Sequence, residues 1–355
     1  MKFATGNAAV IDAALASGCK LFAGYPVTPS TEILEYANAY FPREGRIAVP
    51  TEGEISAVHM VAGASLGGYR AMTATTGLGL SLMSEALSFF SGMTELPGVI
   101  VVQQRWGPGD GSLGPGQDCY DMATRACGHG DFHVIVLAPK SVQEIADHVQ
   151  LAFELADKYG VFVLVLGDQL IAMTSEQYDT PPPSDPVQRP VEYGRNNGLV
   201  MPELVAVDEA AGDFDALETV ARKWERKFAS IEAEEARHEL VGQVDAGTHL
   251  IFAYGSLARI AEHAATILAE RGIQIAVFRP ITLWPFPYYA ARAAAQTAAS
   301  VTVAELSMGQ MRGDVERAAG QRTDGFLNWL GGNSPTPDQF ADAFEAAMAK
   351  IGDFA

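Results

Sequence analysis

Cysteine is scarce in this chain of 355 residues, which carries only Cys19, Cys119 and Cys127. The three form no CxxC pair and no ferredoxin-like run, and an iron–sulfur cluster is normally held by four thiolates. Neither a disulfide framework nor an iron–sulfur cluster held by this chain alone is therefore expected. His129 and His133 lie near Cys127 and suggest a metal site. The nearby sequence offers no fourth ligand, so a structural role is expected instead of a metal.

Basic residues are also in short supply, since 24 lysines and arginines face 43 aspartates and glutamates and the net charge is −19. Nucleic acids and anionic membranes are bound by basic patches, so neither partner is expected. No apolar run is long enough to span a bilayer. Asn7 and Asp12 interrupt the apolar stretch that a signal peptide would need. The sequence predicts a cytoplasmic protein.

What the sequence does contain is an alternation of helical and strand-like segments from residue 6 to residue 168. Two apolar runs, 99–104 and 161–166, are continuous, which is typical of strands buried on both faces. Helices that alternate with such strands predict a mostly parallel sheet. Helices are expected at 7–16, 33–40, 55–66, 81–89 and 142–156, and strands at 20–23, 46–50, 70–76, 99–104 and 161–166.

A proline-rich and charged region interrupts this alternation. Four prolines at 181, 182, 183 and 186 precede a charged amphipathic segment at 216–240, which predicts a linker and a surface helix. The alternation then resumes, with strands expected at 249–253, 275–278 and 301–304 and helices at 257–270, 288–299 and 338–351. The expected organisation is an α/β protein with two mostly parallel-sheet domains, 1–175 and 246–355, joined by a linker and charged helical excursion at 176–245.

The most informative local motif is FAGYPVTPS at 22–30. Its start is strand-like, Pro26 and Pro29 stiffen the following turn, and Ser30 opens an apolar-periodic helix. Such a turn holds the hydroxyl of Thr28 at the carboxyl end of a strand, beside N–H groups that favour an anion. An ordinary βα loop is the alternative interpretation.

Two carboxylates, Glu52 and Glu54, follow another expected strand and open the next helix. Helix N-termini stabilise carboxylates, so capping could explain either residue. Glu54 precedes an apolar run and is expected to be partly buried, where a carboxylate needs a hydrogen-bond donor or a positive charge. Glu54 is therefore a candidate for holding a ligand nitrogen.

Arg105 ends the buried strand 99–104 and precedes a glycine- and proline-rich loop at 106–118. A guanidinium at the carboxyl end of a central strand lies where α/β proteins bind ligands, and it can hold a carboxylate through two hydrogen bonds. A surface arginine in a mobile loop is the alternative. The triplet at 109–111, Gly-Asp-Gly, has no asparagine shortly downstream and is expected to be a turn, so the chain lacks a Mg²⁺–diphosphate half-site.

Several long motifs, in order along nearly the whole chain, are similar to the α subunit of 2-oxoacid:ferredoxin oxidoreductases. They are GYPVTPS, TEGEISAVHMVAGAS, RAMTATTGLGLSLMSEALSFFSGMTELPGVIV, QRWGPGDGSLGPGQ, AYGSLARIA and FRPITLWPFP. The stretch CGHGDFHVIVLAPKSVQE most resembles the branched-chain, or 2-ketoisovalerate, type. The resemblance implies a pyrimidine-binding domain for thiamine diphosphate, followed by a transketolase C-terminal-like domain.

The resemblance also implies roles and partners. Thr28 and Arg105 would bind the substrate carboxylate, Glu54 would hydrogen-bond N1′ of the aminopyrimidine, and Pro26 with Thr28 would line the cofactor pocket. A separate β subunit would carry the diphosphate site, Mg²⁺ and a [4Fe–4S] cluster, and a γ subunit would be a further partner. The implied reaction is oxidative decarboxylation of a 2-oxoacid to acyl-CoA and CO₂, with coenzyme A and ferredoxin as acceptors.

Trp106 and His59 depart from the family pattern, which often has glycine and asparagine there. Trp106 would narrow the pocket, stack on an aromatic substrate or pack beneath the loop, whereas His59 is expected to be structural. Glu305 resembles the family's acidic strand end, where a structural or interface role is expected. The choice among branched-chain acids, 2-oxoglutarate, pyruvate and aryl glyoxylates stays open. So do two other functions, the thiamine-enzyme component of a lipoamide-linked oxoacid dehydrogenase and a non-catalytic structural partner subunit.

Overall fold

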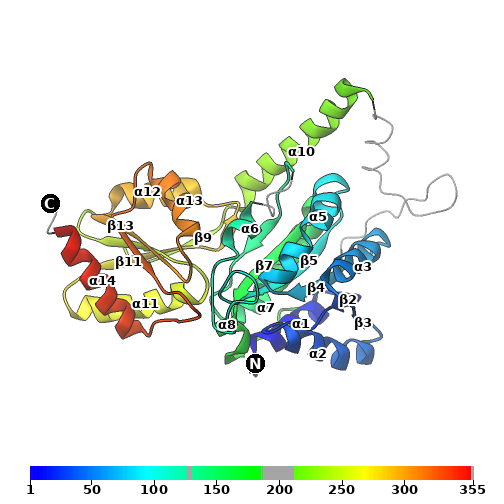
Figure 1. Ribbon diagram of the computed structural model, residues 1–355, viewed down its shortest axis with the longest axis horizontal. Helices are drawn as coiled ribbons and strands as arrows, with labels where there is room; N and C mark the ends of the chain where they lie inside the picture. The colour runs from blue at the N-terminus through cyan, green and yellow to red at the C-terminus, as the bar shows by residue number, and fades with distance from the viewer. Residues whose placement is uncertain (126–129, 185, 187–211, 353–355) are drawn as a thin grey trace.

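The computed structural model describes residues 1–125, 130–184, 186 and 212–352, and it shows two α/β lobes side by side (Figure 1). The described strands form a seven-stranded sheet in the first lobe, a five-stranded sheet in the second and a small separate pair. That pair is antiparallel and consists of β1 (Lys2–Thr5) and β8 (Ser175–Tyr178). The predicted fold class, with two mostly parallel sheets, is confirmed.

The first sheet has the strand order β12-β6-β7-β5-β4-β2-β3, and all neighbours except β12 and β6 are parallel. The two central strands, β5 (Gly98–Gln104) and β7 (Phe162–Asp168), are buried along their whole length, as their apolar runs predict. The remaining parallel strands are β2 (Leu21–Gly24), β3 (Ile47–Pro50), β4 (Ala71–Thr75) and β6 (Ile135–Leu137). Their carboxyl ends meet along one edge of the sheet, where α/β proteins bind ligands.

Two groups of helices pack against this sheet. One group contains α1 (Gly6–Ala16), α2 (Thr31–Tyr40) and α7 (Val142–Tyr159), which pack on one another. The other contains α3 (Glu54–Leu66), α4 (Gly77–Leu82) and α5 (Ser84–Leu87). Shorter helical segments complete the lobe: η1 (Pro42–Glu44), η2 (Ser88–Met93), α6 (Tyr120–Thr124) and α8 (Gln169–Met173).

The single helix expected at 81–89 is wrong in its bounds. The structure divides this region into α4, α5 and the π-helical η2. Ser84 Oγ donates to the carbonyl of Ser81 at 2.9 Å, a local side-chain bond of the kind that competes with the helical ladder. The helix begins earlier than expected, at Gly77, and places its first turn at the carboxyl edge of the sheet directly after β4.

The second sheet has the order β14-β13-β10-β11-β9, with β9 antiparallel to β11 and the other neighbours parallel. Figure 1 shows α11 and α14 on one face and α12 and α13 on the other. The strands are β9 (His238–Val241), β10 (His249–Phe252), β11 (Ile275–Pro280), β13 (Ser300–Glu305) and β14 (Gly325–Asn328). The helices are α11 (Gly255–Glu270), α12 (Tyr288–Thr297), α13 (Gln310–Ala319) and α14 (Pro337–Gly352).

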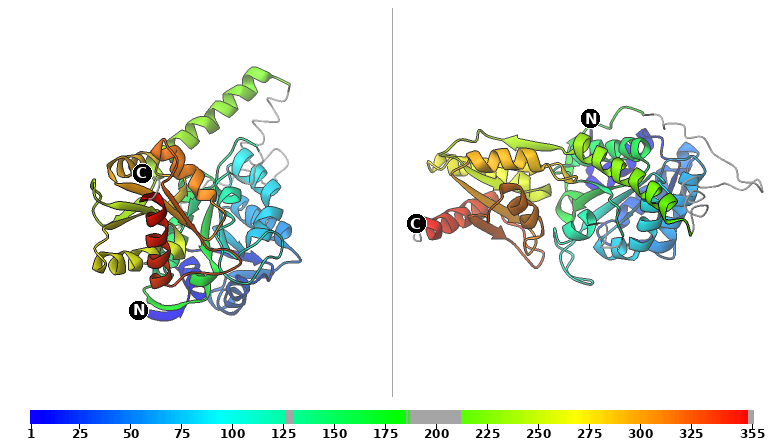
Figure 2. Two further views of the ribbon diagram at one scale, coloured as in Figure 1. Left: turned by 60° about the vertical axis from the view of Figure 1, so that its left-hand side comes forward. Right: turned by 90° about the horizontal axis from the view of Figure 1, so that it is seen from above.

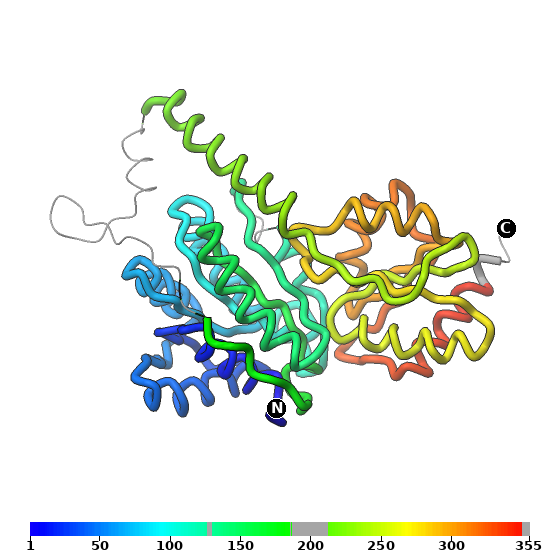
Figure 3. Tube along the Cα trace, turned by 180° about the vertical axis from the view of Figure 1, so that it is seen from behind, coloured from blue at the N-terminus to red at the C-terminus, as the bar shows by residue number. Residues whose placement is uncertain are grey.

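The charged helix α10 (Phe214–Glu235) extends beyond the first lobe and leads to the junction with the second (Figure 3). The predicted surface helix is present, but its expected extent of 216–240 is wrong. The helix ends at Glu235, and β9 follows because its backbone pairs with β11, a partner distant in sequence. Residues 187–211 of the expected linker lie outside the described residues, and the limits of the three predicted domains stay a prediction.

One strand of the second half returns to the first sheet. β12 (Thr282–Trp284) follows β11 but pairs antiparallel with β6, so that Thr282 faces Leu137 and Trp284 faces Val136. The two lobes, which can be told apart in the view from above (Figure 2), are thus joined by a shared strand as well as by the chain. This short strand lies between prolines and has no periodic pattern, so the sequence did not predict it.

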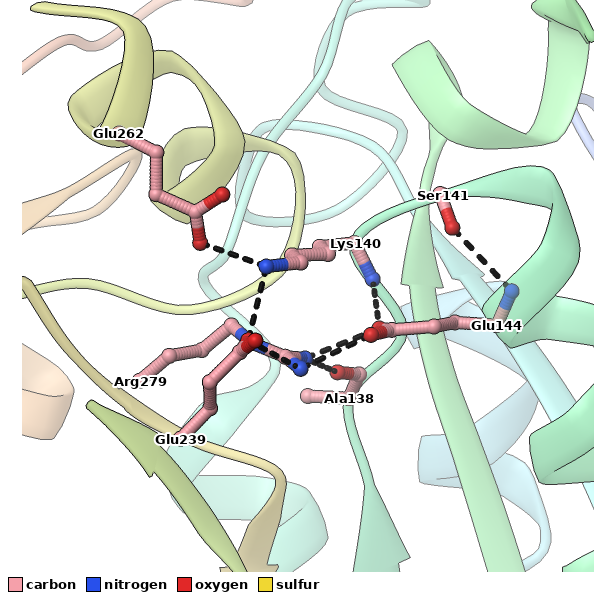
Figure 4. A network of polar contacts seen from close by, with 7 residues as sticks. All are labelled: Ala138, Lys140, Ser141, Glu144, Glu239, Glu262 and Arg279. Atoms are coloured by element: carbon pink, nitrogen blue, oxygen red, sulfur yellow. Dashed lines mark hydrogen bonds and ion pairs between the residues drawn. The ribbon is translucent and has the colours of Figure 1, made fainter. Parts of the chain in front are cut away.

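An ionic network closes the junction between the lobes (Figure 4). Arg279 of β11 is 2% exposed and bonds both carboxylate oxygens of Glu144 in α7, at 2.8 and 2.9 Å. Its Nε donates to Glu239 of β9 at 2.9 Å. Lys140 adds ion pairs to Glu239 at 2.8 Å and to Glu262 of α11 at 2.7 Å. Every charge of the network has an opposite partner, which a buried charge requires.

Among the helices that the structure describes, none combines the length and the apolar character that a bilayer crossing needs. The cytoplasmic location stays a prediction.

Candidate active site at the carboxyl edge of the first sheet

Arg105 directly follows β5, and its side chain reaches the turn after β2. Its Nη1 donates a hydrogen bond to the carbonyl oxygen of Thr28 at 2.9 Å, and its Nη2 lies 3.5 Å from Oδ1 of Asp110. The Arg105 side chain is 12% exposed, whereas that of Asp110 is 96% exposed, so water screens this ion pair. Only β4 lies between β5 and β2 in the sheet. The structure therefore brings Arg105 and Thr28 together.

The turn that carries Thr28 is held by its own backbone and by Ser30. Both the N–H and the hydroxyl of Ser30 donate to the carbonyl of Val27, each at 2.8 Å. The Thr28–Pro29 peptide bond is cis. Pro26 and Thr28 are both exposed, which leaves the Thr28 side chain accessible to a ligand.

Asn7 supports this turn from inside the protein, and the sequence analysis did not identify it. Asn7 is fully buried, and its Nδ2 donates to the carbonyl of Pro29 at 2.9 Å and to Glu32 at 3.2 Å. Gln103 of β5 donates to Asn7 Oδ1 at 3.4 Å. The sequence signal was a polar residue at the start of a mostly apolar helix. Asn7 links the turn to the strand that ends at Arg105.

Glu54 is the first residue of α3 and is 8% exposed. Its side chain packs on the backbone of Gly79 in α4, where an added Cβ would lie 2.5 Å from Glu54 Cγ and 1.9 Å from Thr75 Oγ1. Within the described part of the chain, no donor forms a hydrogen bond or ion pair with the Glu54 carboxylate. Glu52 is exposed and accepts a hydrogen bond from the Ser56 hydroxyl, which lowers the pKa of Glu52. Of the two carboxylates, only Glu54 is buried.

The first turn of α4 connects Glu54 to the Arg105 region. A pocket of about 210 Å³ is lined by Arg105, by residues 76–78 of this turn and by Asp118 and Cys119. Glu54 of α3 does not line this pocket, and it contacts Gly79, which follows the lining residues 76–78 in α4. Burial raises the pKa of the Asp118 carboxyl. The hydroxyls of Thr75 and Thr76 are buried and have no hydrogen-bond partner within the described residues. The candidate site thus has buried polar groups without structural partners.

Trp106 and His59 both contact other residues of the protein outside the pocket. The backbone of Trp106 donates to Gly114 at 3.0 Å and accepts from Ser112 at 2.7 Å, and its side chain does not line the pocket. His59 is exposed, its Nδ1 lies 2.7 Å from the carbonyl of Ile55, and its ring meets the Phe90 ring edge-on. The structural role expected for His59 agrees with these contacts.

Three other sequence expectations can be placed. Residues 109–110 form a turn, as predicted. Glu305 is fully buried and accepts hydrogen bonds from Ser307, Met311 and Arg312 at 2.6–3.0 Å, which fits a structural role at the start of α13. Cys127 and His129, for which a structural role was expected, lie outside the described residues. Within the described ranges, no group of three or more His, Cys, Asp or Glu side chains is arranged to hold a metal ion.

A larger pocket of about 740 Å³ lies between α6, α10 and α12. It contains none of the predicted site residues, so the candidate site is assigned by its chemistry and not by its size.

Comparison with known families covers both lobes. Residues 12–236 match the thiamine diphosphate-binding family of pyruvate flavodoxin/ferredoxin oxidoreductases, and residues 248–340 match core domain II of pyruvate:ferredoxin oxidoreductase. The chain is 41% identical over 335 residues to ketoisovalerate oxidoreductase subunit VorB of Methanothermobacter marburgensis, covering 92% of each chain. It is 34% identical over 366 residues to 2-oxoglutarate synthase subunit KorA of Methanothermobacter thermautotrophicus, covering 95% of this chain and 96% of the relative.

Solved structures show the same relationship. The 2-oxoglutarate:ferredoxin oxidoreductase of Magnetococcus marinus, solved with 2-oxoglutarate, coenzyme A and succinyl-CoA bound, is 26% identical with a TM-score of 0.86. The match covers 98% of this chain and 65% of that one, so this chain spans less than two thirds of its relative. A split-gene transketolase, 14% identical with a TM-score of 0.58 over 97% of this chain and 96% of its own, shows the fold alone. From the family match and the relatives, the chain belongs to the thiamine diphosphate-binding family of pyruvate flavodoxin/ferredoxin oxidoreductases.

Proposed function

We propose that this chain is the α subunit of a thiamine-diphosphate-dependent 2-oxoacid:ferredoxin oxidoreductase, which converts a 2-oxoacid and coenzyme A into acyl-CoA and CO₂. The observation that carries the proposal is the buried Glu54 carboxylate, which has no partner within the described residues. Glu54 packs against α4, and the first turn of the same helix lines the pocket that contains Arg105. The relatives named as ketoisovalerate and 2-oxoglutarate enzymes support the same reaction class.

The residues at Glu54 fit the aminopyrimidine ring of thiamine diphosphate. A buried carboxylate needs a cationic or hydrogen-bonding partner, and a protonated ring nitrogen supplies both. Gly79 leaves room there, because a side chain at this position would collide with Glu54 and Thr75. Glu54 would hold a proton at N1′ of the ring, and Pro26 with Thr28 would line the pocket. When bound, thiamine diphosphate supplies an electron sink for the carbanion left by loss of CO₂.

Arg105 and Thr28 would hold the carboxylate of the 2-oxoacid. Arg105 donates one N–H to the Thr28 carbonyl. Its other contact is with the exposed carboxylate of Asp110, and water screens that ion pair. A substrate carboxylate can therefore replace Asp110 and take a two-bond contact with the guanidinium. The accessible Thr28 hydroxyl can donate to the same group. These residues would fix the acid next to the cofactor without taking part in bond breaking.

The parts that this chain does not supply are proposed to lie on partners. A β subunit would carry the diphosphate site, Mg²⁺ and a [4Fe–4S] cluster, and a γ subunit would complete the complex. Four thiolates normally hold such a cluster, whereas the chain has three cysteines, and burial raises the pKa of Cys19 to about 12, which keeps it a thiol. The two electrons of the oxidation would pass singly to ferredoxin, and coenzyme A would take the acyl group as a thioester.

We propose a branched-chain 2-oxoacid of the 2-ketoisovalerate class as the substrate. The ketoisovalerate relative is 41% identical, against 34% for the 2-oxoglutarate relative. The purified complex would be assayed for coenzyme A-dependent reduction of a viologen dye with 2-ketoisovalerate, 2-oxoglutarate, pyruvate and phenylglyoxylate. We expect the highest kcat/KM with 2-ketoisovalerate, and a higher value for any of the others would overturn this substrate assignment.

The catalytic proposal is tested by Glu54→Gln in the complete complex, with Glu52→Gln as a matched control two residues away. Loss of a group that holds a reacting proton typically lowers the rate by about 10²–10⁴-fold. We expect a loss in this range for E54Q and no change for E52Q, with unchanged subunit composition in both by gel filtration. An assembled E54Q complex with normal turnover would contradict the proposal.

A further inference from the structure

The loop that begins at Arg105 lies between the candidate site and the second lobe. It is closed on itself, because Trp106 and Gly114 are hydrogen-bonded and the N–H of Gly107 donates to the carboxylate of Asp118. The loop is therefore a compact unit whose position can be set by a few anchoring contacts. Arg105 lies at one end of the loop and Asp118 at the other, and both residues line the pocket.

Gln117 is the strongest of these anchors, and all of its polar groups bond to the second lobe. It is fully buried, and its side-chain Nε2 donates to the carbonyl of Tyr254 at 2.8 Å while its Oε1 accepts from the N–H of Leu306 at 2.9 Å. Its backbone N–H donates to the carbonyl of Leu306 at 3.0 Å, and its carbonyl accepts from the Tyr254 hydroxyl at 3.1 Å. Four hydrogen bonds thus join one loop residue to two residues of the second lobe.

Tyr254 and Leu306 are well placed to act as a rigid support. They follow β10 and β13, which are neighbouring parallel strands, so both lie at the carboxyl edge of the second sheet. Each is fully buried. Strand ends in a packed sheet move little, and residues held by such elements are positioned more accurately than residues on a free loop.

Further contacts between the loop and the second lobe agree with this arrangement. Gly114 packs directly on Gly332, since a Cβ at position 114 would lie 2.4 Å from the Gly332 carbonyl oxygen. Gln310 of α13 donates to the carbonyl of Asp118 at 2.9 Å and accepts from the N–H of Asp121 at 2.8 Å. The second lobe therefore contacts the loop at its tip and at its return to α6.

We propose that Gln117 is a positioning residue for substrate binding, through which the second lobe sets the place of Arg105 over the Thr28 turn. This inference rests on the proposed function, because Arg105 must be the group that holds the 2-oxoacid carboxylate. Gln117 itself bonds only to the protein in this arrangement. Its loss would free the loop and displace the guanidinium, and a displacement of about 1 Å in a binding group can lower turnover efficiency by about 10²-fold.

The test compares Gln117→Ala with Arg105→Met, the double variant and a control, all in the complete complex. The control is Arg259→Gln, which breaks another contact between the lobes, the ion pair with Glu176, away from the loop. For Q117A we expect an increase of about tenfold in KM for the 2-oxoacid with a smaller change in kcat, because a held carboxylate contributes to binding. R259Q is expected to leave KM unchanged, which a general loosening of the lobes would not do.

The double variant separates this inference from the proposed function. If Gln117 acts through Arg105, Q117A adds nothing further to the KM of R105M. If R105M alone leaves KM unchanged, the proposed role of Arg105 fails and the inference fails with it. If R105M raises KM while folded Q117A does not, only the positioning role is overturned. Additive effects of the two substitutions would also overturn it.

Tyr254→Phe provides a second, milder variant in case Q117A does not assemble. It removes the hydroxyl that donates to the Gln117 carbonyl and leaves the ring in place. We expect about a threefold increase in KM, which corresponds to loss of one ordinary hydrogen bond from the anchor. An assembled Y254F complex with an unchanged KM would count against the inference.

Discussion

Glu54 and Glu144 both lie in the first turn of a helix, yet their surroundings differ. Glu144 accepts two hydrogen bonds from Arg279 and one from the backbone N–H of Lys140, and it joins the lobes. Glu54 is buried and has no such partner within the described residues. A helix N-terminus stabilises either carboxylate, so the local sequence cannot show which of the two is structural and which binds a ligand. A carboxylate with matched partners, such as the partly buried Glu144, therefore maintains architecture, whereas a buried one without them indicates a ligand.

The largest effect is expected where the paired charges are broken. Arg279→Met removes the central cation, so that among the described residues Glu144 loses its only ion pair and Glu239 keeps Lys140 alone. Breaking a buried ion pair on one side typically costs about 3–5 kcal/mol of unfolding free energy. Urea denaturation of the purified chain measures this loss. The exposed pair between Arg259 and Glu176 is the control, and R259Q is expected to change stability by less than about 1 kcal/mol. Equal losses in both variants would show that burial and pairing do not distinguish these sites.

A smaller effect is expected from His148, which is buried in α7 near Arg279. Burial, with Arg279 and Arg237 nearby, lowers the pKa of His148 from its ordinary value of 6.5 to about 3. The folded protein keeps this ring neutral, while the unfolded chain binds a proton below pH 6.5. The unfolding free energy should therefore fall by about 1.5–2 kcal/mol from this group as the pH drops from 6.5 to 5.

His148→Leu isolates that contribution from the carboxylates that also titrate in acid. We expect a shallower loss of stability between pH 6.5 and 5 in this variant than in the parent chain, measured by urea denaturation at several pH values. The same slope in both proteins would mean that His148 is protonated in the folded state.

The smallest effect concerns Glu54, for which stability and activity are expected to change in opposite directions. Because its carboxylate has no partner to lose, Glu54→Gln should raise the unfolding free energy of the isolated chain by about 0.5–1 kcal/mol, in contrast to its expected loss of activity. Thermal unfolding of E54Q beside E52Q measures the difference. A clear loss of stability in E54Q would place Glu54 with the structural carboxylates.

Local pattern was sufficient for much of the fold and for the first members of the site. Continuous apolar runs identified β5 and β7 as buried strands, and Arg105 was expected at the carboxyl end of the first. Its contact with the turn after β2 is a finding of the structure. Contacts between distant segments could not be predicted in the same way. Asn7 and Gln117 act through partners far away in sequence, so nothing in their own neighbourhood indicates the bonds that they form.

The division of α4 and the early end of α10 have related causes. Next to residue 83, the hydroxyl of Ser84 bonds locally and competes with a continuous helix, although the apolar spacing favours one. After Glu235, a strand forms because an open sheet edge accepts it. Helical periodicity describes one face of a segment and carries no information about which sheet edge lies within reach.

The return of β12 to the first sheet has a consequence for the architecture as a whole. Without Thr282–Trp284, the backbone of Ile135–Leu137 would present unpaired N–H and C=O groups along an apolar strand, which favours association with other chains. The N-terminal half therefore relies on the second half to cover this edge, and we expect a fragment that ends near residue 245 to associate through it unless the remaining polypeptide is supplied alongside.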